Sequence, residues 1–110
     1  MTEPQVFEAI LSLANREDNI RAVLMEGSRA NPNTAPDKWQ DFDIVYVTRE
    51  NAPYIDGAWM KNMFLPQFGE VAVRQIPDDG APNLVYTWLI QFSSGLRIDL
   101  TLNSLAFLTS

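Results

Sequence analysis

The chain has 110 residues, a formal net charge of -6 at pH 7, and neither cysteine nor histidine. A chain of this length can bury one modest hydrophobic core, which indicates a single small domain. The missing residue types exclude disulfides, Ser-His catalytic triads and zinc sites held by cysteine or histidine. Any metal or acid–base chemistry therefore has to use carboxylates, whose hard oxygens suit Mg²⁺, Mn²⁺ or Ca²⁺.

The acidic balance also narrows the choice of partners. The sequence shows no basic patch of the kind that binds nucleic acid, and no apolar stretch as long as a membrane span. Its first residues lack the basic and apolar regions of a signal peptide. We therefore expect a cytoplasmic protein that binds neither nucleic acid nor membranes, and whose charge favours a cationic or neutral small substrate.

The first half of the chain predicts a helix followed by two strands. Thr2 and Gln5 have the spacing of a capping box, and apolar residues at helical spacing then continue to Ala14. Residues 20–26 form a mostly apolar segment, which favours a strand in the centre of a sheet. Gly27 and Ser28 end this strand, with room for a short helix before Pro32, and 31–40 has the composition of a loop. Residues 41–48, rich in β-branched and aromatic side chains, are the clearest strand.

The second half predicts a broken helix, a further strand and a hairpin. Residues 52–69 read as the helix, weakened by Gly57 and bounded by Pro53 and Pro66. Residues 70–76 read as a strand, 77–83 as a turn, and 84–92 with 96–102 as a hairpin. Ser104 is placed to cap a last helix. This order predicts an α+β fold with a mixed sheet covered by helices.

Asp41 and Asp43 stand at the head of the clearest strand. Residues two apart in a strand point to the same face, so the two carboxylates should lie side by side. Aspartate is depleted in strands and like charges repel, a cost that a shared divalent cation would offset. The alternative is a polar strand end that faces solvent, but Val45 and Val47 make the same face apolar further along.

Two other features gain weight beside this pair. Gly27-Ser28 follows a strand, and such a turn can hold phosphate oxygens with its N–H groups, with Arg29 adding positive charge. Asp99 shares a strand face with Arg97 and Thr101, opposite the apolar face of that strand. Taken alone, the first could be a plain turn and the second an exposed hairpin face.

Together, the Gly-Ser turn, the Asp-x-Asp strand and a third acid on a later strand match the pattern of DNA polymerase β-like nucleotidyltransferases. The segments "EGSRANPN", "WQDFDIVYVT" and "LRIDLTL" resemble more closely the N-terminal domain of the aminoglycoside 6-adenylyltransferases, also called streptomycin adenylyltransferases. The resemblance runs from about Glu8 to Leu102, with residues 51–83 similar only in outline. It implies the nucleotidyltransferase fold, with 1–110 as the N-terminal domain of a longer protein whose helical C-terminal domain completes the substrate cleft.

The resemblance also implies roles for individual residues. Gly27, Ser28 and Arg29 would bind the ATP phosphates, and Asp41, Asp43 and Asp99 would bind two Mg²⁺ ions. Asp99 would also lie near the substrate hydroxyl as a candidate proton acceptor. The reaction would transfer AMP from ATP to an aminoglycoside such as streptomycin, which would give antibiotic resistance.

Two other functions remain open at this point. The chain could be a stand-alone nucleotidyltransferase that modifies a protein or RNA partner, as in toxin–antitoxin systems. It could also be a catalytically incomplete nucleotide-binding module. The sequence leaves open the hydroxyl modified, the general base, the oligomeric state and whether the 110 residues act alone.

Overall fold

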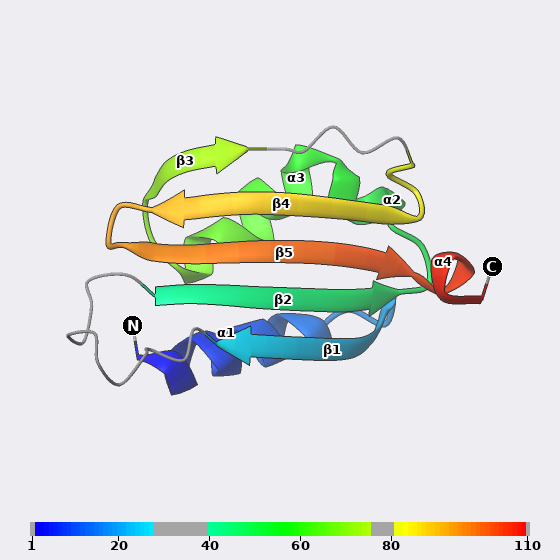
Figure 1. Ribbon diagram of the computed structural model, residues 1–110, viewed down its shortest axis with the longest axis horizontal. Helices are drawn as coiled ribbons and strands as arrows, with labels where there is room; N and C mark the ends of the chain where they lie inside the picture. Colours follow the sequence, from blue (N-terminus) through cyan, green and yellow to red (C-terminus); the bar gives the residue numbers. More distant parts are fainter. Residues whose placement is uncertain (1, 28–39, 76–80, 110) are drawn as a thin grey trace.

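The computed structural model describes residues 2–27, 40–75 and 81–109, in which five strands form one mixed sheet (Figure 1). The strands are β1 (Ile20–Gly27), β2 (Gln40–Thr48), β3 (Val71–Gln75), β4 (Val85–Phe92) and β5 (Leu96–Ser104). Their spatial order is β1-β2-β5-β4-β3. Only the β2–β5 pairing is parallel among those described, because β5 lies between two strands that run opposite to each other. The predicted α+β class and mixed sheet are thereby confirmed.

Helices cover one face of the sheet, behind the strands in Figure 1. Helix α1 (Glu3–Asn15) begins at the predicted capping box, in which the Thr2 hydroxyl accepts from the Gln5 N–H at 3.3 Å. Its buried residues Val6, Ile10 and Leu13 belong to the hydrophobic core. At the carboxyl end of β5, Ser104 caps the short helix α4 (Leu105–Thr109) by accepting from the Phe107 N–H, as predicted.

The predicted broken helix is confirmed and consists of four short pieces. They are α2 (Ala52–Ile55), α3 (Gly57–Trp59), a π-helical turn η1 (Met60–Phe64) and a 3-10 turn η2 (Leu65–Gln67). The first break falls at Asp56, which has an extended backbone and whose side chain accepts from the Ala58 N–H. None of the helices in the described ranges is long and apolar enough to cross a membrane.

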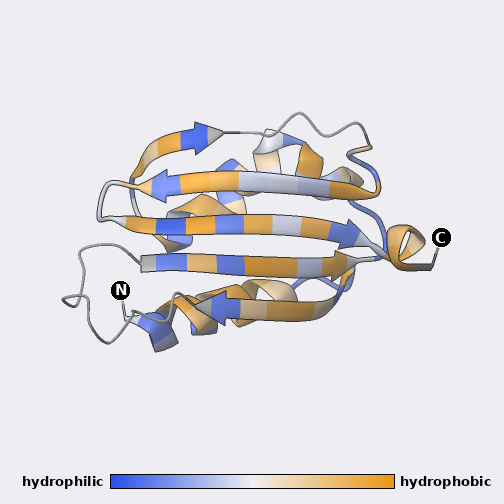
Figure 2. Ribbon diagram, in the orientation of Figure 1, coloured by the Kyte–Doolittle hydropathy of each residue, from blue (hydrophilic) through white to orange (hydrophobic). Residues whose placement is uncertain are grey.

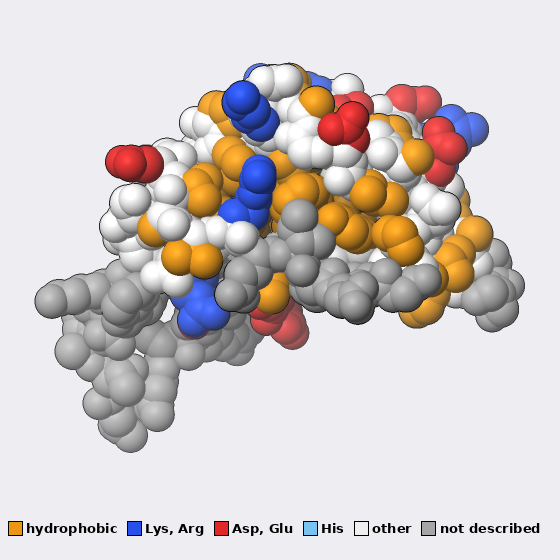
Figure 3. Space-filling view, turned by 90° about the horizontal axis from the view of Figure 1, so that it is seen from above, with side chains coloured by type: hydrophobic (Ala, Val, Ile, Leu, Met, Phe, Trp, Pro, Cys, Tyr) orange, Lys and Arg blue, Asp and Glu red, His pale blue; other side chains and the backbone are white. Residues whose placement is uncertain are grey.

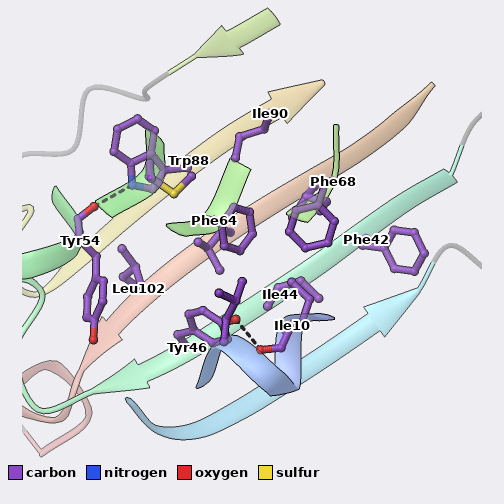
Figure 4. Packing of buried hydrophobic residues seen from close by; sticks show 14 of the residues in the cluster. Ile10, Phe42, Ile44, Tyr46, Tyr54, Phe64, Phe68, Trp88, Ile90 and Leu102 are labelled. Carbon is purple, nitrogen blue, oxygen red and sulfur yellow. Dashed lines mark hydrogen bonds between the residues drawn. The ribbon is translucent and has the colours of Figure 1, made fainter. Parts of the chain in front are cut away.

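The core lies between these helices and the sheet (Figure 4). β5 follows the two-residue period of a half-buried strand, with Leu96, Ile98, Leu100 and Leu102 all buried. Two aromatic side chains in the core use their polar ends: the Tyr46 hydroxyl donates to the Ile10 carbonyl at 2.7 Å, and Trp88 Nε1 donates to the Tyr54 carbonyl at 3.0 Å. Such partners are what allow Tyr and Trp to be buried at low cost.

One sequence prediction about the sheet is wrong. The segment 20–26 was expected in its centre, whereas β1 is an edge strand that pairs with β2 alone among the described strands. Its apolar character reflects partial burial of Val23 and Met25 against the core, while Leu24 remains 62% exposed. The short helix expected before Pro32 and most of the loop 31–40 lie outside the described residues.

Candidate active site

The three acids of the sequence pattern come together on neighbouring strands. In the parallel pairing of β2 with β5, Asp43 lies opposite Asp99, and Asp41 lies opposite Arg97. Paired residues in a sheet project from the same face, and alternation keeps positions two apart on that face too. All four residues line one hollow of about 170 Å³, together with Phe42. Residues 41, 43 and 99 therefore line the same hollow, and their role as metal ligands stays a prediction.

This hollow lies on the face of the sheet opposite the helices. In Figure 2 the hydrophilic bands of β2 and β5 lie side by side near the amino ends of both strands. Further along β2, Val45 is half-buried and Val47 is buried, so the face becomes apolar as the sequence indicated. The acids thus occupy a polar end of an otherwise mixed surface.

The charge of Asp99 is influenced by each of its neighbours. Partial burial raises its pKa most, and the negative charge of Asp43 raises it further. The positive charge of Arg97 lowers it, while hydrogen bonding to Asp43 and the charge of Asp41 act upward again. The net result is a raised pKa, the expected behaviour of carboxyl groups crowded into one space. Negative charge is therefore in excess around Asp99.

A guanidinium group already sits in the hollow. Arg97 Nε lies 3.7 Å from Asp41 Oδ1, and the two side chains are 54% and 57% exposed. The sequence did not predict this ion pair between Arg97 and Asp41. The alternation of β5 placed Arg97 on the same face as Asp99, but only the β2–β5 register sets it opposite Asp41.

The turn expected to bind phosphate begins beside the acids. Gly27, the last residue of β1, pairs with Phe42, and Glu26 pairs with Asp43. Glu26 thus extends the row of acids onto a third strand, a placement that the sequence alone could not give. Ser28 and Arg29 lie outside the described residues.

The donor set suits Mg²⁺, which prefers oxygen ligands and is commonly held by a few carboxylates together with water and phosphate. Burial raises the pKa of Asp99 most, and the negative charges of Asp43 and Asp41 add to this rise; a cation would offset their repulsion. With the side chains as they stand, no group of three or more acids within the described ranges is arranged to hold a metal ion. The chemistry of the donors fits a cation, and closer convergence of the carboxylates would be needed to bind one.

Comparison with known proteins supplies the family. A family model described as streptomycin adenylyltransferase matches residues 1–110, which is the whole chain. The chain belongs to this family. The resemblance noted from the sequence motifs is thereby confirmed.

Streptomycin adenylyltransferase relatives come from several bacteria. Aminoglycoside 6-adenylyltransferases from Campylobacter jejuni and Bacillus subtilis are 34% and 32% identical to this chain, each over 92% of it. One from Staphylococcus aureus is 29% identical over 94% of the chain. The matched regions make up 35%, 36% and 37% of these relatives, so the chain spans about a third of their length.

A solved structure identifies the fold of this family member. The crystal structure of an aminoglycoside 6-adenyltransferase from Bacillus subtilis superposes with a TM-score of 0.70 at 23% identity. The superposition covers 99% of this chain and 38% of that one. The expected nucleotidyltransferase fold is therefore correct.

Proposed function

We propose that this chain is the nucleotidyltransferase domain of an enzyme that transfers AMP from ATP to a hydroxyl group of an aminoglycoside such as streptomycin, giving antibiotic resistance. The observation that carries the proposal is that Asp41, Asp43 and Asp99 line one open hollow. Membership of the streptomycin adenylyltransferase family along the whole chain supports the reaction class.

In this proposal Asp41, Asp43 and Asp99 hold two Mg²⁺ ions, and Gly27, Ser28 and Arg29 bind the phosphates of ATP. Bound Mg²⁺ would neutralise triphosphate charge and make the acceptor hydroxyl more nucleophilic. Gly27 supports the phosphate role because β1 ends beside the strand that carries Asp41 and Asp43. Arg29 would add a guanidinium, a group well matched to phosphate oxygens.

In this proposal the acceptor lies beside Asp99. Asp99 lines the hollow of the acids and also a second hollow of about 170 Å³, which extends toward β3 and β4. The second hollow mixes apolar and polar side chains, lined by Val73, Leu89, Ile90, Gln91, Arg97 and Asp99. An acceptor lying there would bring its hydroxyl to Asp99, while the nucleotide lies on the side of Asp41 and Asp43.

The proposed chemical step is attack of the acceptor hydroxyl on the α-phosphate of ATP. The acceptor oxygen forms a bond to the α-phosphorus of ATP, and the bond from that phosphorus to the bridging oxygen of the β-phosphate breaks. Pyrophosphate leaves with the electron pair, and the hydroxyl proton passes to the Asp99 carboxylate.

The acceptor cleft extends beyond the described surface in this proposal. A helical C-terminal domain would complete it, which is compatible with the share of the relatives' length that lies outside the match. The net charge of -6 suits a polycationic aminoglycoside. Figure 3 shows acidic and basic side chains scattered among hydrophobic ones on the face seen from above.

The test is pyrophosphate release from ATP and Mg²⁺, measured with the 110-residue chain and with any longer natural polypeptide that contains it. Release that depends on streptomycin or another aminoglycoside supports the proposal. Release that depends on a protein or RNA acceptor would replace it with a partner-modifying nucleotidyltransferase. ATP binding without release in any of these mixtures would leave a nucleotide-binding module instead.

A further inference from the structure

Arg97 occupies a position of positive charge inside a cluster of acids. It lies opposite Asp41 on the parallel strand pair, with Arg97 Nε 3.7 Å from Asp41 Oδ1. Asp99 lies two positions further along the same strand face, and Asp43 lies opposite it. Arg97 therefore shares one hollow with three carboxylates.

The ion pair engages a side chain that the proposed function assigns to a metal. A carboxylate oxygen paired with a guanidinium cannot be given to a divalent cation without weakening that pair, and the cation also meets repulsion from the nearby guanidinium. Both side chains are about half exposed, so the pair itself is weak and can be displaced. A contact of this strength would adjust metal affinity without preventing binding.

We propose that Arg97 is a resident counter-cation of the acidic site, which holds Asp41 when no metal is bound and has to release it when a divalent ion enters. This inference rests on the proposed function, since it takes Asp41 to be a metal ligand. Arg97 acts through Asp41 and is therefore a positioning residue. Its charge makes metal binding weaker than the three acids alone would allow.

The experiment is a Mn²⁺ titration of the 110-residue chain by isothermal calorimetry at low salt, without nucleotide. Arg97→Gln removes the competing charge, so we expect Mn²⁺ to bind about two- to five-fold more tightly than in the original chain, the range that an exposed ion pair contributes. The gain should shrink toward zero near 1 M salt, where charges are strongly screened. Arg97→Lys keeps the charge and should restore an affinity within about two-fold of the original.

Arg49→Gln is the matched control. Arg49 pairs with the exposed Asp18 at 3.6 Å and follows the other end of β2, roughly 25 Å from Asp41 at the usual rise per residue. The Arg49→Gln substitution removes one positive charge, as Arg97→Gln does, but far from the acids. It should therefore leave the Mn²⁺ affinity unchanged. Asp43→Asn should abolish most of the heat of binding, which shows that the titration reports this site. Arg97→Met serves as a second neutral variant if circular dichroism shows Arg97→Gln to be misfolded.

The outcomes separate this inference from the function on which it rests. Mn²⁺ binding that is lost in Asp43→Asn, but is equal or weaker in Arg97→Gln, would overturn the counter-cation role and leave the acidic metal site standing. A gain of the same size in Arg49→Gln would reduce the effect to overall charge and overturn it too. Failure of the original chain and every variant to bind Mn²⁺ would overturn the metal site and this inference together.

Discussion

Asp43 and Asp99 lie directly opposite each other on β2 and β5, the parallel strand pair of the described sheet, and both line the same hollow. This cross-strand relationship brings two carboxylates together at one end of the sheet, where a like-charge pair is unfavourable unless something offsets it.

Asp43→Asn tests the role of the pair in catalysis. The substitution removes one proposed metal ligand while preserving the shape of an exposed side chain. Mutation of a residue that only orients a metal ligand typically lowers metal affinity or activity by about 10–100-fold. We therefore expect loss of a metal ligand itself to lower aminoglycoside-dependent pyrophosphate release by more than about 100-fold. Asp18→Asn makes the same change at an 88% exposed aspartate elsewhere and should leave the rate unaltered. Near-normal turnover in Asp43→Asn would rule out the two-metal proposal.

Asp99→Asn tests the electrostatic cost of the site. Because the pKa of Asp99 is raised in the folded state, the fold binds this proton more tightly than the unfolded chain does. The stability that protonated Asp99 contributes is therefore present below 3.8, the pKa in the unfolded chain, and is lost as pH rises through the higher pKa of the folded state. Asn carries no such charge. As pH is raised from about 3 to 7, we expect the free energy of unfolding of Asp99→Asn to increase relative to that of the original chain.

Urea unfolding at a series of pH values measures this difference. A gap between the two proteins that stays constant or narrows with rising pH would contradict the electrostatic account. If the proposed function is correct, Asp99→Asn should combine this gain in stability with loss of turnover.

Asn51 is a buried polar residue that no sequence pattern singled out. Its side chain accepts from the Thr48 hydroxyl at 2.7 Å and donates to the Leu102 carbonyl at 2.8 Å and the Pro82 carbonyl at 3.1 Å. It thus joins the end of β2 to β5 and to the turn before β4. Asn51→Ala leaves these groups without their partner, and we expect it to lower the free energy of unfolding by about 1–3 kcal/mol.

The matched control for this change is Asn62→Ala, at an exposed position of η1. A substitution at such a surface site is expected to change stability by no more than about 0.5 kcal/mol. Thermal unfolding followed by circular dichroism compares the two variants. Equal transition temperatures would show that the Asn51 hydrogen bonds contribute little.

Thr2→Ala tests the capping box of α1. The Thr2 N–H donates to Gln5 Oε1 at 2.8 Å, and the Thr2 hydroxyl accepts from the Gln5 N–H at 3.3 Å. Loss of the hydroxyl removes one of these bonds, and we expect a loss of about 1 kcal/mol in stability. Thr2→Ser keeps the hydroxyl and should behave like the original chain in the same urea titration. A similar loss in both variants would point to packing of the Thr2 methyl group instead.

The sequence predicted those parts of the site that depend on local periodicity. Alternation places Asp41 with Asp43 and Arg97 with Asp99, because side chains two apart on a strand must share a face. The sequence could not predict the register of the two strands, because no local pattern determines which residue of β2 pairs with which residue of β5. The Arg97–Asp41 ion pair and the position of Glu26 beside Asp43 both depend on register, and the sequence predicted neither.

The error over β1 has a related cause. Apolar composition reports that the faces of a strand meet apolar surroundings, but it does not report how many strands lie beside it. Val23 and Met25 pack against the core while Leu24 is 62% exposed, which is compatible with an edge position. The broken helix between Pro53 and Pro66 was predictable because proline and glycine act locally. The π-helical turn within it was not.

The parallel pairing of β2 with β5 also bears on how the protein folds. The two strands that bring the aspartates together are separated along the chain by the helical pieces, β3 and β4, so nearly half of the polypeptide forms the intervening loop. Closing so long a loop carries an entropic penalty that hairpins such as β4–β5 avoid. Contacts of this kind slow folding. The carboxylate pocket is therefore expected to assemble late, after the β4–β5 hairpin. If the proposed metal site exists, metal binding should recover more slowly during refolding than the helical signal.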